Sequence, residues 1–207
     1  MLTFWRHGYE TTTIADLTTA MRVTAPSLYT AFGDKKQLFL EAMRLYAGDQ
    51  EAIGRAIDDA PTAHAAVRDM LTSAAIAFTG QATPKGCLLA SATATGSAAS
   101  ADVQRAVADI RQGIQTRIAA RIDRDIADGL MPSQTPTPAL SGLAIAVIQG
   151  MSVLARDGAT RTSLIAIAAA AMATWPRHDG ERAPRRRHDG ERAPRRAAVR
   201  KRSARAP

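Results

Sequence analysis

The sequence predicts an all-α protein, with an N-terminal helix-turn-helix domain followed by a C-terminal helical domain. Its alanine-rich apolar content, with only 4% aromatic residues, favours helices over sheets. Apolar residues also recur at helical spacing along much of the chain, most regularly between Val103 and Ile126. Two short segments of this kind lie close together near the N-terminus, which indicates a helix-turn-helix.

The first helix of this motif is predicted from apolar residues that share one face. Ile14, Leu17 and Met21 follow the spacing i, i+3, i+7. Residues 21–24 form the predicted turn, and a second short helix is expected over about 25–32. Two short helices joined by a tight turn are the usual way to present a recognition helix to the major groove of DNA.

Hydroxyl side chains precede both predicted helices. Thr12 or Thr13 supplies an acceptor for the free backbone N–H groups of the first helix. Thr24 can cap the second helix, and Pro26 suits its first turn, where a missing N–H has no cost. In the turn, Val23 is expected to point back between the two helices.

Several short motifs occur in an order and spacing that resemble the DNA-binding domain of the TetR family of bacterial one-component repressors. The resemblance covers roughly the first 46 residues. It rests on these stretches: Phe4-Trp5-Arg6-His7-Gly8-Tyr9, Thr12-Thr13-Ile14-Ala15-Asp16, Ser27-Leu28-Tyr29, Phe32-Gly33-Asp34-Lys35 and Leu38-Phe39.

The resemblance implies a cytoplasmic, all-helical homodimer that binds a palindromic DNA operator. It also implies a variable C-terminal domain that binds a small-molecule inducer and so releases the DNA. The implied function is that of a ligand-responsive transcriptional regulator, a repressor, and not of an enzyme. The family implies no cofactor.

Two departures from the family pattern bear on this function. Arg22 stands where the family's turn carries glycine, and a left-handed backbone at that position would cost roughly 1 kcal/mol. The family's first helix begins well before the point that corresponds to Met1, so Phe4 and Trp5 are expected to be less well held. The alternative function is therefore a helical small-molecule-binding or scaffold dimer that has lost DNA binding through its truncated first helix.

Eight residues in and around the motif are candidate DNA contacts: Thr12, Thr13, Arg22, Thr24, Ser27, Tyr29, Thr30 and Lys35. Ser27 and Thr30 are expected near base edges, and Tyr29 near a phosphate or a thymine methyl. The alternative is that these side chains are exposed polar groups with no partner in DNA.

The remaining candidates are expected to contact the DNA backbone. Lys35 can meet a phosphate together with the backbone N–H groups at the start of the next helix, or else be a solvated lysine. Thr12 or Thr13 can combine capping with a phosphate contact. Arg22 either adds a phosphate contact or is solvated.

The chain is divided into three parts: a DNA-binding domain at 1–47, a ligand-binding and dimerisation domain at 48–176, and a disordered basic tail at 177–207. Helices after the motif are expected from Asp34 to about Gly48, from Thr62 to Phe78, and over 101–130, 139–155 and 162–175. The last two are nearly uncharged, so a second subunit is expected to cover them.

The net charge of +8 lies wholly in the tail, where twelve basic and four acidic residues include an exact tandem decapeptide repeat. The high isoelectric point is therefore weak support for DNA binding. The tail has almost no apolar residues, so it cannot bury a core and is expected to be disordered. Duplication by slippage in the coding DNA is the favoured explanation, and a nonspecific phosphate-binding arm is the alternative.

A ligand pocket is expected among the helices between Pro61 and Ala155, with these candidate lining residues: Met70, Phe78, Cys87, Leu89 and Met151. Cys87 is more typical of a buried structural residue than of a redox or electrophile sensor. No His or Cys pair has metal-ligand spacing, and Asp123, Asp125 and Asp128 are interpreted as a solvated face.

No membrane partner is expected. The longest apolar run, 164–175, falls short of the ~20 residues that span a bilayer, and no signal peptide opens the chain. The single cysteine excludes an intramolecular disulfide and suits a reducing cytoplasm.

Overall fold

The computed structural model describes residues 1–48, 50–91 and 100–176, and all regular secondary structure in these ranges is helical. The predicted fold class is thus confirmed. The basic tail predicted at 177–207 lies outside the described residues. The helices are α1 (Leu2–His7), α2 (Ile14–Met21), α3 (Ala25–Phe32), α4 (Lys35–Ala47), α5 (Gln50–Asp58), α6 (Ala63–Phe78), α7 (Leu88–Ser91), α8 (Ala101–Ala127), α9 (Thr137–Arg156) and α10 (Arg161–Ala173).

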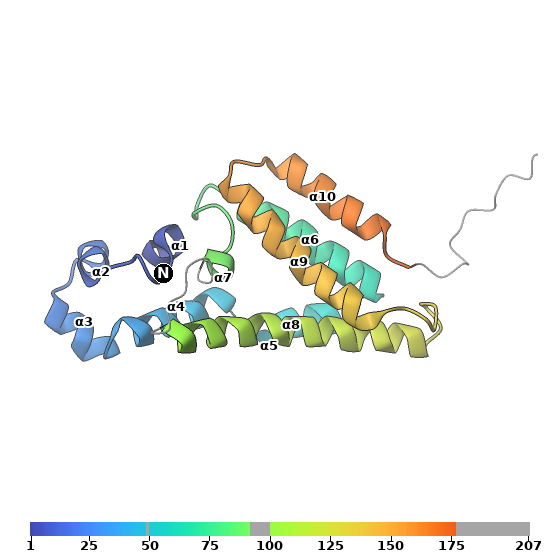
Figure 1. Ribbon diagram of the computed structural model, residues 1–207, viewed down its shortest axis with the longest axis horizontal. Coiled ribbons are helices and arrows are strands. Elements are labelled where there is room, and N and C mark those ends of the chain that lie inside the picture. The colour runs from blue at the N-terminus through green and yellow to red at the C-terminus, as the bar shows by residue number, and fades with distance from the viewer. Residues whose placement is uncertain (49, 92–99, 177–207) are drawn as a thin grey trace, which may run out of the picture.

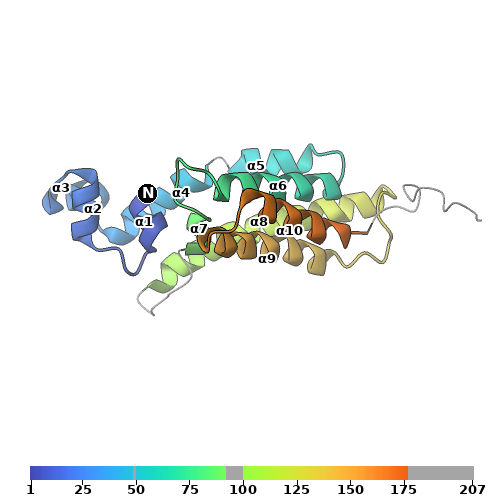
Figure 2. The same ribbon diagram turned by 90° about the horizontal axis from the view of Figure 1, so that it is seen from above.

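The molecule is elongated, with α2 and α3 at one end and the bundle of α6, α8, α9 and α10 at the other (Figures 1 and 2). Helix α4 leads from the first group to the second and contacts α8. The short α7 lies beneath α1 and contacts α1, α4 and α9. It therefore connects the N-terminal helices with the bundle.

Helices α1 to α4 enclose a small aromatic core. Phe4 is fully buried and meets Phe39 edge-on, with ring centroids 5.1 Å apart. Tyr9 packs on both rings. Leu17 and Leu28 fill the space between α2 and α3. The expectation that Phe4 and Trp5 would be poorly held is wrong, because α4 and α7 cover the short first helix.

The turn between α2 and α3 is closed by its backbone. Arg22 adopts the left-handed conformation, with φ 56° and ψ 43°, as its place in the motif predicted. This conformation lets the N–H of Val23 reach the Thr18 carbonyl at 3.1 Å. The Val23 side chain is 38% exposed, so the prediction that it packs between the helices is wrong.

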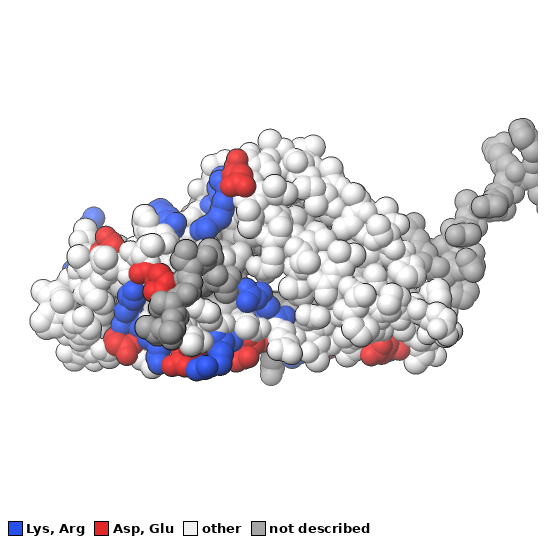
Figure 3. All heavy atoms as spheres, viewed as in Figure 1, with Lys and Arg blue, Asp and Glu red and all other residues white. Residues whose placement is uncertain are grey.

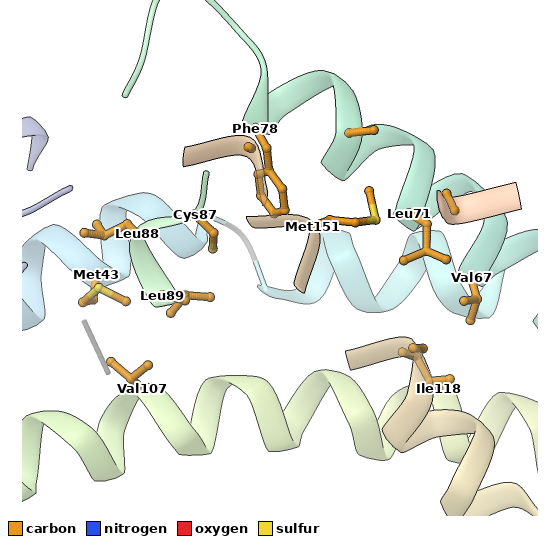
Figure 4. Close-up of a cluster of buried hydrophobic side chains, with 14 of the residues drawn as sticks. Met43, Val67, Leu71, Phe78, Cys87, Leu88, Leu89, Val107, Ile118 and Met151 are labelled. Atoms are coloured by element: carbon orange, nitrogen blue, oxygen red, sulfur yellow. The ribbon is translucent and has the colours of Figure 1, made fainter. Parts of the chain in front are cut away.

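The branched apolar residues of α8 separate into three groups along the helix. Val103 and Val107 are buried toward α4 and α7, where Val107 lies near Met43 and Leu89 (Figure 4). Ile118 and Ile122 are buried further along the helix. The middle pair, Ile110 and Ile114, is only partly buried, because a cavity lies against that part of α8.

The acidic residues near the end of α8 are not all solvated, which corrects the sequence-based interpretation. Asp125 is 1% exposed and accepts a hydrogen bond from the Ala63 backbone N–H at 2.6 Å. It also pairs with buried Arg121 at 3.0 Å. The Asp125 carboxylate thus satisfies a backbone N–H at the start of α6 that has no partner within that helix. The spacing of acidic residues along α8 did not indicate this contact.

Helix α9 is long and apolar enough to span a bilayer, although only a third of its apolar window is buried in the molecule. Core helices of globular proteins meet the same criterion, and α9 packs against α6, α8 and α10. Its outer side and the neighbouring side of α10 leave large apolar residues exposed: Leu143, Val153, Leu154 and Ile165. Such a face is suited to burial against another surface.

Candidate DNA-binding surface and ligand cavity

The exposed side of α3 carries hydroxyl groups and no charge. Ser27, Tyr29 and Thr30 are all exposed, whereas Leu28 between them is buried. This division arises because Leu28 alone among the four faces α2. In the view of Figure 3 the end formed by α2 and α3 shows few charged side chains, and basic and acidic groups mix near the start of α8.

The hydroxyls of α3 are fixed by local hydrogen bonds but keep capacity for a partner. Thr24 caps the helix by accepting from the Ser27 N–H at 3.3 Å, and the two hydroxyls lie 2.9 Å apart. The Thr30 hydroxyl donates to the Pro26 carbonyl at 2.9 Å. A hydroxyl has one donor hydrogen and two acceptor lone pairs, so each can still accept from a base edge or water.

Of the two threonines before α2, the structure selects Thr13 as the cap. Its hydroxyl accepts from the Asp16 N–H at 3.1 Å, and the Asp16 carboxylate accepts from the Thr13 N–H at 2.9 Å. These two bonds form a capping box. The Thr13 hydroxyl also donates to the Asp16 carboxylate at 2.7 Å, and this bond, together with the one from the Thr13 N–H, lowers the pKa of Asp16 below its usual value.

Thr12 is withdrawn as a candidate DNA contact. Its side chain is fully buried, and its hydroxyl donates to the Gly8 carbonyl at 2.6 Å. It therefore has no surface to offer a phosphate and instead joins the end of α1 to the start of α2.

Lys35 also has a different role from the one predicted. Its Nζ donates to the carbonyls of Tyr9 at 3.1 Å and Thr12 at 3.0 Å, with the Glu10 carbonyl at 3.4 Å, and lies 4.5 Å from the centre of the Tyr9 ring. An ammonium group has three hydrogens, and all three have acceptors here. Lys35 holds the segment between α1 and α2 against α4, so neither the phosphate contact nor the solvated alternative describes it.

Arg22 is exposed in the turn, beside α3. It remains a candidate phosphate contact together with Thr13. The candidates that remain exposed are therefore Thr13, Arg22, Thr24, Ser27, Tyr29 and Thr30.

A cavity of about 1040 Å³ lies among α5, α6, α8 and α9, and it is also lined by Trp5 of α1 and by Tyr46 and Ala47 of α4. Its walls are largely apolar, with contributions from α1, α4, α5, α6, α8 and α9. Four of the five predicted lining residues are found there: Met70, Phe78, Cys87 and Leu89. Met151 is not, because it is 1% exposed and packs in the core beside Phe78 (Figure 4). Helical spacing identified the apolar residues but not which side of α9 faces the cavity.

Sequence reasoning missed two aromatic residues of the cavity wall, Trp5 and Tyr46. They meet edge-on with ring centroids 4.8 Å apart. The Tyr46 hydroxyl donates to the Cys87 sulfur at 3.2 Å, and burial, with the nearby thiol, raises the pKa of Tyr46. The resemblance of the N-terminal motif assigned Trp5 to the domain core, and nothing in the sequence indicated that the same ring borders a cavity.

Cys87 is buried beside Leu88 and Leu89, with Phe78 and Met151 across from it (Figure 4). Its backbone N–H donates to the Ser152 hydroxyl at 2.8 Å. Lys85, the nearest cation in sequence, donates to the carbonyls at the end of α6 and not to the thiol. Among the described residues, no group of three or more His, Cys, Asp or Glu side chains is placed to hold a metal ion.

The fold and the exposed α3 together define a helix-turn-helix DNA-binding protein. Residues 3–42 match the family described as "Bacterial regulatory proteins, tetR family". Over 181 residues the chain is 32% identical to the HTH-type transcriptional repressor ComR of Escherichia coli, and the match covers 85% of each protein. The chain belongs to the TetR family of transcriptional regulators, a family of regulatory proteins and not of enzymes.

Two solved structures of the family are similar over most of their length. A cysteine-substituted form of the TetR family regulator CifR, complexed with 26 bp double-strand operator DNA, is 36% identical with a TM-score of 0.79, and the match covers 84% of this chain and 92% of that chain. A TetR regulator from Rhodococcus sp. RHA1 is 36% identical with a TM-score of 0.58 and coverages of 84% and 93%.

Proposed function

We propose that this protein is a cytoplasmic, ligand-responsive repressor that binds a palindromic operator as a homodimer and is released by a small-molecule inducer. The observation that carries the proposal is the exposed hydroxyl face of α3 on an assembled helix-turn-helix. The similarity to CifR, whose structure contains operator DNA, supports it.

The exposed apolar residues of α9 and α10 support the homodimer. Val153 is 54% exposed and Ile165 39% exposed, on neighbouring helices. The exposed small residues Ala146 and Gly150 on α9 allow a second backbone to approach closely, whereas Gly142 on the same helix lies near Gln115 of α8. A twofold dimer would place two α3 helices in successive major grooves, about 34–36 Å apart, which requires a palindromic site.

Induction requires that the ligand distinguish two conformations. The cavity is bordered by α1 and α4 on one side and by α6 and α8 on the other, so its occupant touches both parts of the protein. A ligand that binds more tightly when α1 and α4 are displaced stabilises that conformation of the dimer. In this conformation the two α3 helices no longer have the separation that two successive major grooves require. The coupling is reciprocal: the operator must weaken binding of the inducer by the same factor.

Operator selection from random duplex DNA by the purified full chain tests the proposal. We expect a palindromic sequence with half-sites about one helical turn apart. Thr30→Ala combined with Tyr29→Ala should lower affinity for the selected site about 10-fold or more without changing the helix content.

Thr72→Ala is the matched control for this experiment. The Thr72 hydroxyl on α6 donates to the Arg68 carbonyl at 2.8 Å, the same bond to the residue four positions back that Thr30 makes on α3. The control should bind the operator like the parent. Enrichment of no sequence over the random pool would favour the alternative of a dimer that does not bind DNA.

A further inference from the structure

Three hydrogen-bond donors meet at the end of the cavity nearest the helix-turn-helix. Trp5 of α1, Tyr46 of α4 and Cys87 before α7 all border the cavity. Each of these side chains can donate, through an indole N–H, a phenol O–H and a thiol S–H. Around them the wall is made of aliphatic side chains such as Ile53, Ile57 and Ile114.

This group of donors is poorly supplied with acceptors. The Trp5 indole N–H is buried, in a side chain 6% exposed, and has no hydrogen-bond partner. Because the indole nitrogen has almost no accessible surface, an acceptor in the cavity reaches it only when the Trp5 ring shifts. The Tyr46 hydroxyl donates to the Cys87 sulfur, a weak acceptor. Buried donors are nearly always paired in folded proteins, because an unpaired one forfeits its hydrogen bond to water. The arrangement therefore favours a molecule that brings an acceptor of its own.

We propose that the inducer is an apolar molecule carrying a neutral hydrogen-bond acceptor, such as a carbonyl oxygen, which is received by the Trp5 N–H and the Tyr46 O–H. This inference rests on the proposed function and specifies the chemistry of its ligand. A neutral acceptor is favoured because the largely apolar wall would not compensate a buried charge on the ligand. Two arginines that line the cavity already have partners in the protein, Arg117 with Asp58 and Arg161 with Thr79. The aliphatic wall takes up the apolar body of the ligand.

The same contact carries ligand occupancy to the DNA-binding domain. Trp5 lies in α1, one residue after Phe4 of the aromatic core, and Tyr46 lies at the end of α4. The Trp5 carbonyl accepts a hydrogen bond from Arg156 at the end of α9, at 2.6 Å. A ligand that displaces the Trp5 ring thus moves α1, and α1 contacts both the aromatic core of the DNA-binding domain and the end of α9.

The two tryptophans of the chain make a direct test with full-length protein labelled with ¹⁵N-tryptophan. Its spectrum should contain two indole N–H signals, from Trp5 and Trp175, which Trp175→Phe assigns. The probes are 2-acetylnaphthalene and 2-ethylnaphthalene, which share a shape and differ in one carbonyl group. We expect the ketone to move the Trp5 proton signal downfield and the hydrocarbon not to do so.

Calorimetric titration with the same probes measures how much the carbonyl group adds to the binding affinity. Burial of apolar area alone would favour the hydrocarbon, so a ketone that binds about 3- to 10-fold more tightly identifies the hydrogen bond. Trp5→Phe and Tyr46→Phe should each reduce this preference, and Trp175→Phe, which makes the same chemical change elsewhere, should keep it. Thermal melting confirms that each variant folds.

The proposal is overturned if both probes bind equally, if the ketone binds without moving the Trp5 signal, or if neither binds. These measurements contain no DNA. A failure here accompanied by successful operator selection would refute the ligand chemistry alone, whereas failed operator selection would refute the proposed function.

Discussion

Arg22 is held in a backbone conformation that usually selects glycine. Its φ of 56° brings Cβ close to the following carbonyl, at a cost of roughly 1–2 kcal/mol for a residue with a side chain. The turn tolerates this because α2 and α3 are fixed by Leu17 and Leu28 and by caps at both starts. Retention of arginine there is consistent with a phosphate contact.

We therefore expect Arg22→Gly to raise the free energy of unfolding by up to about 1 kcal/mol, the strain relieved exceeding the added chain entropy. It should also reduce the salt dependence of operator affinity by about one counterion. Arg22→Ala removes the charge but keeps the strain, so denaturant melts of the two variants separate the effects. Equal stability of the two variants would show that the turn is not strained.

Lys35 is a charged residue with a structural role, because its ammonium group binds backbone carbonyls of the segment between α1 and α2. Because its three donors are taken by carbonyls between α1 and α2, Lys35→Met should lower the free energy of unfolding by about 1.5–3 kcal/mol. Lys36→Met is the matched control, since Lys36 pairs with Asp102 at the surface, and it should cost less than about 1 kcal/mol. Urea melts measure both. A similar loss in the two variants would contradict the role assigned to Lys35.

At the scale of elements, α8 shows how one amphipathic pattern serves several neighbours. Its branched residues keep helical spacing throughout, yet one part packs on α4 and α7, the middle borders the cavity, and the end packs on α5, α6 and α9. Periodicity defines the apolar side of a helix, but the neighbours along that side come from segments far away in the sequence.

The start of α6 depends on this last part of α8. Asp125→Ala would leave the Ala63 N–H unpaired and strand the buried Arg121 guanidinium without its carboxylate. We expect a loss of about 3–5 kcal/mol in the free energy of unfolding. Asp123→Ala on the exposed side, which removes one hydrogen bond with Thr137, should cost under about 1 kcal/mol. Thermal unfolding by calorimetry distinguishes the two, and a mild effect of Asp125→Ala would refute the assigned role.

At the scale of the whole molecule, we expect the subunit interface at the exposed apolar residues of α9 and α10. Not every apolar residue of α9 is available for this interface, because Ile148 borders the cavity. Val153 and Ile165 face outward. The subunit contact is therefore expected along the outer sides of both helices.

Val153→Asp combined with Ile165→Asp should convert the expected dimer into a monomer, because a charge desolvated on both sides of a twofold interface has no partner. Light scattering gives the mass of each species. Leu45→Asp, on α4 at a site 72% exposed, is the control and should remain dimeric. A monomeric parent protein would rule out this interface.

Much of the fold and part of the candidate site could be predicted from local rules. The bounds of α3, the caps at Thr24, Asp34 and Thr62, and the left-handed Arg22 all follow from neighbours within a few residues. Lys35, Asp125 and Trp5 could not be interpreted in this way. Lys35 donates to the Thr12 carbonyl, Asp125 accepts from the Ala63 N–H, and the Trp5 carbonyl accepts from Arg156. Each of these contacts joins residues 23 or more positions apart, and no spacing pattern records them.

The sequence by itself determined the helical class, the helix-turn-helix and the family, because periodicity, capping and motif order are local properties of a chain. Only the tertiary structure decided which polar residues are free to meet DNA and which are used inside the protein. In the folded protein Thr12 is buried and Lys35 is hydrogen-bonded to backbone carbonyls. Trp5, Tyr46 and Cys87 all line one cavity. The physical reason is that a side chain's function depends on its solvent exposure and its partners, and both are set by segments that meet only when the chain folds.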